Sequence, residues 1–201
     1  MKDLHLCKVK NYRKVQINKQ TFYHLSLFTL YGFGIIGYLI IEFWLGEPFP
    51  GIFAGEESWH FQAGYGIVYG IAASLIAILY IKMPFFKNSL KTYIRLVKRL
   101  KLTYNDIVFF SFCAAVGEEI LFRAAIQPII GIWPTAVLFV ALHGYLTPYN
   151  WRLSIYGIFM VLVSAGFGYL YEYVGLFSAI TAHFLIDVIL FTILKREAEK
   201  I

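Results

Sequence analysis

The side chains best suited to chemistry are two adjacent carboxylates, Glu118 and Glu119, followed by Arg123. All three stand within an apolar run from Ile107 to about Gln127. A charged side chain at the bilayer centre costs about 2.5–3.5 kcal/mol on insertion scales, so each needs a partner. Glu119 and Arg123 are four residues apart, which predicts an ion pair on one face of a helix. Glu118 lies about 100° around that helix and needs a partner from elsewhere.

Two histidines in later apolar runs, His143 and His183, are the candidate partners of Glu118. At a rise of about 1.5 Å per residue, Glu118 and His183 each lie roughly 18 Å from the polar end of their runs, and His143 roughly 13 Å. Ionisable residues buried at one depth usually face an interior cavity that contains water. We therefore expect these three side chains to meet inside the protein.

A carboxylate and two imidazoles around a water molecule are typical of a hydrolytic site. The carboxylate can take a proton from the water, and a histidine with a polar neighbour can stabilise the oxyanion that forms. The same three groups could instead hold zinc, with one coordination position left for water. Asp187 follows His183 by four residues and either fixes the tautomer of that imidazole or joins the cavity. The spacing does not decide between hydrolysis with and without a metal.

The composition indicates the kind of protein that positions these groups. Of 201 residues, 59% are hydrophobic and only 15% are charged, whereas soluble domains are nearer half apolar and one quarter charged. The mean hydropathy is +0.65. We expect one integral-membrane domain over residues 1–201, all-α in fold class. Cys7 and Cys113 are too few for a disulfide framework and are expected to be free thiols.

Six apolar runs predict six transmembrane helices with a basic amphipathic helix between the second and third. Residues 1–21 form a basic tail, 22–81 hold two spans, 82–106 form the basic connection, and 107–194 form a four-span catalytic core. The fourth span is short and ends near Leu146, with His143 inside it. In the basic connection, apolar residues fall at helical spacing, which suggests a helix on an anionic membrane surface; they are Tyr93, Leu96, Val97 and Leu100.

Lys and Arg residues indicate how the chain is oriented. Seventeen of the 18 precede the first span or follow the second, fourth or sixth; the exception is Arg123. This bias predicts that both termini are cytoplasmic, in what we expect to be a prokaryotic plasma membrane. The net charge of +6 is thus a topology signal, and no nucleic-acid partner is expected.

Three motifs in order resemble the CAAX-protease and bacteriocin-processing (Abi) family of intramembrane endopeptidases. They are Glu118-Glu119-x-x-x-Arg123, Phe139-x-x-x-His143 and His183-x-x-x-Asp187. The resemblance covers about residues 107–194, and residues 1–106 carry no matching motif. It implies peptidase activity, glutamic-type or metal-dependent, on a membrane-associated protein or peptide such as a prenylated tail, a leader or a sorting signal.

The resemblance also implies roles for single residues. Glu118 resembles the general base, acting with His143, while His183 and the residue four positions later resemble the pair that stabilises the oxyanion. Many members have Asn where this chain has Asp187, and an ionised Asp would repel an oxyanion. Asp187 must therefore be protonated, orient His183 or help to hold a metal. We expect no required cofactor, with zinc on Glu118, His143 and His183 as the alternative.

The remaining site residues have structural interpretations. Glu119 and Arg123 are expected to form a structural or substrate-orienting ion pair, and Phe139 to pack beside His143. A second Glu-Glu-His cluster, Glu56 to His60, lies in an outer loop and is interpreted as interfacial, with Trp59 as an anchor.

Two other functions compete with hydrolysis. One is a non-catalytic membrane scaffold or bacteriocin-immunity-type protein of the same fold. The other is a small transporter whose Glu and His side chains relay protons, although no inverted repeat or pair of broken helices is visible.

Overall fold

The structure, a computed structural model, describes the backbone of residues 18–200 and their side chains except those of residues 86–92. The described residues contain helices and no strands, as the all-α prediction requires. Most of the predicted basic tail, including Cys7, lies outside the described residues. Cys113 is buried and free, as expected.

Long helices make up most of the described chain. The first runs from Lys19 to Leu45 and comprises α1 (Lys19–Phe28), a π-helical stretch (Thr29–Phe33), α2 (Gly34–Leu39) and a second π-helical stretch (Ile40–Leu45). After a 3₁₀ turn (Phe49–Phe53) come α3 (Trp59–Lys82), another 3₁₀ turn (Pro84–Phe86) and α4 (Lys87–Leu100). The helix α5 (Tyr104–Glu119) continues through a π-helical segment (Ile120–Ile126) into α6 (Gln127–Ile130). The last three are α7 (Ile132–Leu142), α8 (Trp151–Tyr173) and α9 (Leu176–Glu199).

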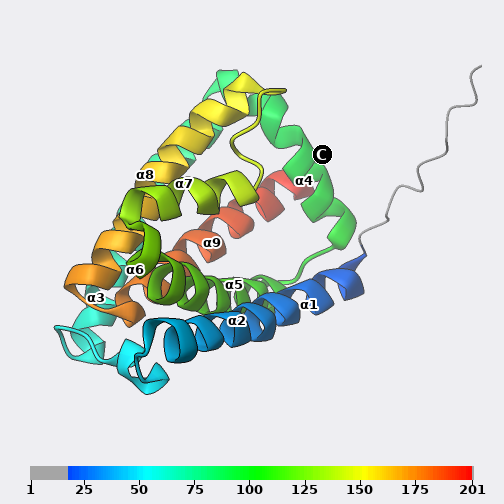
Figure 1. Cartoon of the computed structure of the whole chain (residues 1–201). Helices are drawn as coiled ribbons and strands as arrows, with labels where there is room; N and C mark the ends of the chain where they lie inside the picture. The colour runs from blue at the N-terminus through cyan, green and yellow to red at the C-terminus, as the bar shows by residue number, and fades with distance from the viewer. Residues whose placement is uncertain (1–17, 201) are drawn as a thin grey trace, which may run out of the picture.

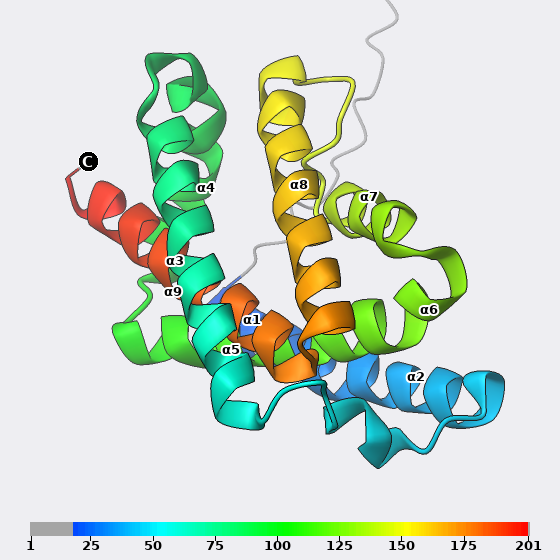
Figure 2. The ribbon, with the colours of Figure 1, turned by 90° about the vertical axis from the view of Figure 1, so that its left-hand side faces the viewer.

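The helices form a frame around α9. In Figure 1, α3 and α8 form one side of a triangular outline, α1, α2 and α5 form its base, and α4 forms the third side. Figure 2 shows α3 and α8 upright, while α1, α2 and α5 cross their lower ends. The central helix α9 packs against α3, α4, α5 and α8, so it is positioned from several directions.

Small residues allow α3 to approach α9 closely. The face of α3 buried against its neighbours carries Gly66, Gly70, Ala73, Ser74 and Ala77. A Cβ added at Gly66 would lie 2.5 Å from the carbonyl oxygen of Ser178. Helices in membranes commonly pack through such small residues because these let the backbones approach. This contact fixes the part of α9 that carries His183.

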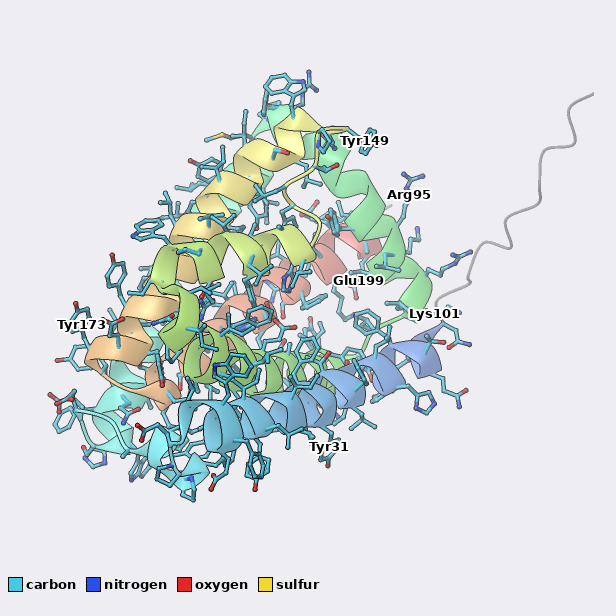
Figure 3. All side chains as sticks on the ribbon, viewed as in Figure 1. Tyr31, Arg95, Lys101, Tyr149, Tyr173 and Glu199 are labelled. Atoms are coloured by element: carbon cyan, nitrogen blue, oxygen red, sulfur yellow. The ribbon has the colours of Figure 1, made fainter. Side chains whose placement is uncertain are left out.

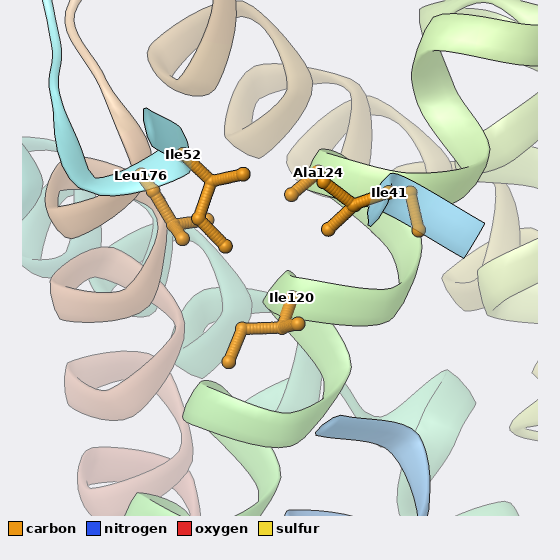
Figure 4. Packing of buried hydrophobic residues seen from close by; sticks show 6 residues of the cluster. Ile41, Ile52, Ile120, Ala124 and Leu176 are labelled. Atoms are coloured by element: carbon orange, nitrogen blue, oxygen red, sulfur yellow. The ribbon is translucent and has the colours of Figure 1, made fainter. Parts of the chain in front are cut away.

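A second close contact holds the helix that carries the two carboxylates. Gly117 lies so near the first helix that an added Cβ would overlap the carbonyl oxygen of Thr29. Just beyond, the π-helical segment is held by an apolar cluster, whose side chains Ile41, Ile52, Ile120, Ala124 and Leu176 are labelled in Figure 4. The carboxylates are therefore on a segment packed from two sides.

Four of the six predicted spans are confirmed as helices long and apolar enough to cross a membrane: Lys19–Leu45, Trp59–Lys82, Trp151–Tyr173 and Leu176–Glu199. Their outward faces carry large apolar side chains, among them Phe28, Val68 and Ile158. The helix formed by α5 and its extension carries Glu118, Glu119 and Arg123 and is not among the four.

The prediction for the fourth span is wrong in its extent. The helix α7 has 11 residues, which at a rise of about 1.5 Å per residue covers roughly half of the hydrocarbon layer. It ends at Leu142, so His143 is its C-cap residue and not part of a span to Leu146. Gly144 follows with a φ of 75°, a left-handed conformation that glycine adopts readily and that turns the chain away.

The basic connection forms the helix α4. Its residues Val97 and Leu100 are buried in a cluster with Ile107, Phe110 and Ala198. Part of its apolar face therefore contacts protein, while Lys98 and Arg99 are exposed. A membrane-surface position for α4 stays a prediction.

Candidate active site

Glu118 meets both predicted histidines. Its Oε2 lies 3.5 Å from Nε2 of His143 and 3.9 Å from Nε2 of His183. The Glu118 side chain is 11% exposed, and this Oε2 is buried without a hydrogen-bond partner in the structure. A buried carboxylate oxygen of this kind is available to a polar group that enters the site.

The other nitrogen of each imidazole is held by an acceptor. Nδ1 of His143 lies 2.7 Å from the carbonyl oxygen of Phe139, and Nδ1 of His183 lies 2.8 Å from Oε1 of Glu119. A carbonyl or an ionised carboxylate can only accept, so each Nδ1 must carry the hydrogen. Both imidazoles are thereby oriented with Nε2 towards Glu118.

Glu119 belongs to a buried network behind His183. Its Oε2 accepts a 2.9 Å hydrogen bond from Nε of Arg123, which is the predicted ion pair, and Arg123 also donates to the hydroxyl of Ser164 over 2.8 Å. The side chains of Glu119 and Arg123 are both 0% exposed. A carboxylate with two charge-assisted partners is a rigid anchor, so Glu119 holds His183 in place.

Aromatic rings surround the histidines. Phe139 lies 4.4 Å from the His143 ring between centroids, as predicted, and also contacts Arg123, whose guanidinium carbon is 5.4 Å from the Phe139 centroid. Phe167 of α8 stacks on His183 at 5.4 Å with an interplanar angle of 13°. These rings restrict the imidazoles and exclude water from the network behind them.

Asp187 lies on the cavity side of His183. Its Oδ2 is 3.6 Å from Nε2, the nitrogen that also faces Glu118, and its side chain is 26% exposed. Since Glu119 occupies Nδ1, it is Glu119 that fixes the tautomer of His183. Of the two alternatives for Asp187, this geometry favours a place in the cavity, because α9 positions Asp187 beside the opposite nitrogen.

Three adjoining cavities open at the site, and Tyr145 and Asp187 line all of them. One of about 70 Å³ contains His143 and His183, and one of about 270 Å³ contains Glu118 and the two histidines. A third, of about 250 Å³, is mostly apolar and lies between α1, α3, α4, α8 and α9, with Tyr93 and Leu96 in its wall. The reactive groups thus border space suited to an extended, apolar ligand.

The zinc alternative requires the same side chains to act as metal ligands. Within residues 18–200, no three His, Cys, Asp or Glu side chains are grouped so as to hold a metal ion. The predicted set of Glu118, His143 and His183 does converge, but it is not in an arrangement of that kind. The expectation that no cofactor is required, with zinc as the alternative, stays a prediction.

The sequence predicted the residues around the cavity better than those behind it. Glu118, His143, His183 and Asp187 are brought together, and Glu119, Arg123 and Phe139 lie next to them. The contacts of Ser164 and Phe167 were missed, as was the hydrogen bond between Glu119 and His183. Residues 153–171 include Gly157, Ser164, Gly166 and Gly168, small residues that let membrane helices pack closely, and this pattern is the signal that could have pointed to Ser164.

The outer-loop cluster, defined as Glu56, Glu57, Ser58, Trp59 and His60, lies apart from the site. All five residues are exposed, Trp59 by 69%. Ser58 Oγ lies 2.9 Å from Nε2 of His60, and none of the five residues lines the three cavities. Its interpretation as interfacial stays a prediction.

Comparison with known proteins agrees with the motifs. Residues 101–189 match the family model described as type II CAAX prenyl endopeptidase Rce1-like. The chain is 35% identical over 129 residues to the uncharacterized protein YpbD of Bacillus subtilis (strain 168), a match that covers 61% of this chain and 66% of YpbD. No solved structure matches the chain. Residues 101–189, which contain all three motifs, are thus similar to the Rce1-like CAAX prenyl endopeptidases.

Proposed function

We propose that this protein is an intramembrane endopeptidase that hydrolyses a peptide bond with water activated by Glu118. The observation that carries the proposal is the position of Glu118: a buried, unpartnered carboxylate oxygen faces Nε2 of both His143 and His183. The Rce1-like match and the apolar cavities beside the site support a peptidase in a lipid environment.

The proposed reaction begins with a water molecule between Glu118 and His143. Glu118 takes a proton as the water oxygen attacks the carbonyl carbon of the substrate, and the carbonyl oxygen becomes an oxyanion. When this intermediate collapses, the carbon–nitrogen bond breaks and the proton held by Glu118 passes to the leaving amine. His143, held through Nδ1 by the Phe139 carbonyl, orients the water with Nε2.

The oxyanion needs a donor on the opposite side of the carbonyl. His183 supplies one when Nε2 is also protonated, because Nδ1–H is then directed at Glu119 and Nε2–H at the cavity. Carboxyl groups of Glu118, Glu119 and Asp187 lie within 3.9 Å of the ring nitrogens of His183, which favours such an imidazolium. In this proposal Asp187 stabilises the proton on Nε2 until the oxyanion forms.

The substrate in this proposal is a membrane-associated protein or peptide. An extended segment entering through the apolar cavity would bring its lipid-like or apolar part against Tyr93, Leu96 and Leu190, with its peptide bond near Asp187. A prenylated tail suits this cavity best, and a leader or sorting signal with apolar residues would also fit.

The test uses purified protein in liposomes with quenched fluorescent peptides, each carrying a prenyl or acyl anchor. We expect cleavage by the wild type and a loss of about 10²–10⁴-fold in Glu118→Gln, the range for removing a general base. The matched control is Glu172→Gln, at the far end of α8, which should cleave as the wild type does. Cleavage by Glu118→Gln at the wild-type rate would contradict the proposal.

The same preparation tests the expected independence from metal. We expect less than one equivalent of zinc per chain by elemental analysis and unchanged cleavage after dialysis against a chelator. One tightly held zinc per chain, with activity lost on chelation and restored by zinc, would instead assign Glu118, His143 and His183 to a metal centre.

A further inference from the structure

A pocket with three lysines lies away from the candidate active site. It measures about 590 Å³ and is formed where α4 ends, α5 begins and α9 ends. Its charged rim carries Lys98, Lys101 and Lys195, and one acidic residue, Glu199, also lines it. Figure 3 shows Lys101 and Glu199 on the side of the molecule where these helices converge. We call this the lysine pocket.

The floor of the lysine pocket is apolar. Val97, Leu102 and Ala198 line it and are 4%, 4% and 5% exposed. The lysines therefore surround a buried apolar surface, whereas lysines on an ordinary charged face are surrounded by solvent. A ligand with both an anionic group and an apolar part would match it.

Two of the lysines are held by the fold. Lys195 has an 18% exposed side chain, makes an ion pair with Glu199, and lies 5.3 Å above the ring centroid of Tyr104. Lys101 has a φ of 49°, the only left-handed non-glycine residue within 18–200. Lysine adopts this conformation at an energetic cost, and such strained residues are concentrated at binding sites.

An apolar stripe leads out of the pocket along α5. Tyr104, which lines the pocket, is followed at intervals of four residues by Val108 and Phe112, and the three are 53%, 47% and 51% exposed. Residues four apart share a helix face. The stripe runs from the lysines into the segment predicted to cross the membrane, which is the direction that an acyl chain would take from a head group at the surface.

We propose that the lysine pocket binds the phosphate of an anionic phospholipid, with an acyl chain along Tyr104, Val108 and Phe112. The ammonium groups of Lys98, Lys101 and Lys195 would contact the phosphate oxygens, and Glu199 would be displaced from Lys195. Basic pockets between helices at the cytoplasmic side are recognised sites for anionic head groups. The distribution of Lys and Arg predicts that this face is cytoplasmic.

The experiment measures lipid retention by native mass spectrometry. Full-length protein is purified from nanodiscs of phosphatidylcholine containing phosphatidylglycerol. We expect the wild type to retain phosphatidylglycerol, and Lys98→Gln/Lys101→Gln/Lys195→Gln to retain it about tenfold less. The matched control, Lys82→Gln/Arg152→Gln/Arg196→Gln, also lowers the net charge from +6 to +3 and should retain lipid as the wild type does.

Two results would overturn the proposal. Equal loss of lipid in both triple variants would show that the positive charge of the protein attracts anionic lipid diffusely, without a specific site. Displacement of the lipid by inorganic phosphate at an equal anion concentration would show that the pocket takes a phosphate group alone. Circular dichroism checks that each variant is folded, and this check does not depend on the lysine pocket or on peptidase activity. Failure of the peptidase proposal would leave this test unaffected.

Discussion

The candidate active site and the outer-loop cluster contain the same kinds of side chain in different surroundings. Each has two adjacent glutamates and a histidine near them, but Glu118 and Glu119 are buried whereas Glu56 and Glu57 are exposed. In the site, every imidazole Nδ1 has an acceptor and Nε2 faces a carboxylate. In the loop, His60 contacts the hydroxyl of Ser58 at the surface. Burial and fixed orientation, more than residue type, separate a candidate catalytic group from a surface cluster.

The largest expected effect is the loss of peptide-cleavage rate when a histidine of the active site, rather than of the outer-loop cluster, is replaced. His143→Gln and His183→Gln should each lower the rate of peptide cleavage about 10²–10⁴-fold, because each removes a positioned proton-transfer or oxyanion group. His60→Gln should stay within about twofold of the wild type. The measurement is the initial rate on anchored peptides in liposomes. Comparable losses in all three variants would remove the distinction between the clusters.

The buried ion pair should matter more for stability than exposed pairs do. Arg123→Met leaves Glu119 buried without its cation, which typically costs about 3–5 kcal/mol. Lys200→Met breaks an exposed pair with Glu197, and we expect no measurable change. Denaturant unfolding in detergent measures both. A stable Arg123→Met protein would show that His183 alone can compensate the charge of Glu119.

A change in the packing beside Glu118 and Glu119 should have a smaller effect on the free energy of unfolding. Gly117→Ala places a methyl group against the carbonyl oxygen of Thr29, and such overpacking costs about 1–3 kcal/mol. Gly64→Ala, in α3 with no atom within 4 Å of the added Cβ, should be neutral or slightly stabilising. Thermal unfolding of the two variants compares a constrained and an unconstrained helix position. Equal melting temperatures would contradict the close contact between α5 and the first helix.

The convergence of Glu118, His143 and His183 could be predicted because depth depends only on residue count along a helix. Contacts behind the site depend on rotation about each helix axis, which the sequence does not give. Glu119 ends the regular helix α5 and His183 lies in α9, so the hydrogen bond between them depends on how these two helices are rotated towards each other.

The end of the short helix α7 was predicted wrongly for a related reason. Residues 135–146 are apolar enough to continue a span, and hydropathy does not show where a helix turns back into the protein. The left-handed Gly144 ends it, and His143 thereby reaches the site from a turn. Four long spans could be predicted from the sequence, because a candidate span is recognised by its length and its apolar composition, and both can be read from the sequence.

The smallest expected effect concerns Asp106 and pH. Burial alone would raise the pKa of Asp106, but hydrogen bonds from Lys19, Tyr23 and Thr103 hold that pKa below its ordinary value. A depressed carboxyl pKa contributes stability that is present above the unfolded-state pKa of about 3.9 and is lost as pH falls through the folded-state value. The advantage of wild type over Asp106→Asn should therefore be greatest above about pH 5 and shrink in acid. An advantage that does not change between pH 3 and pH 7 would contradict this assignment.

The most direct test of the central claim is a survey of N-terminal peptides in host membranes that carry wild type, Glu118→Gln or Glu57→Gln at matched levels. We expect new termini in membranes with wild type and Glu57→Gln, and their absence with Glu118→Gln. Those termini would also identify the substrate class. The same peptides in all three membranes, with all three proteins folded and abundant, would contradict peptidase activity and favour a membrane scaffold.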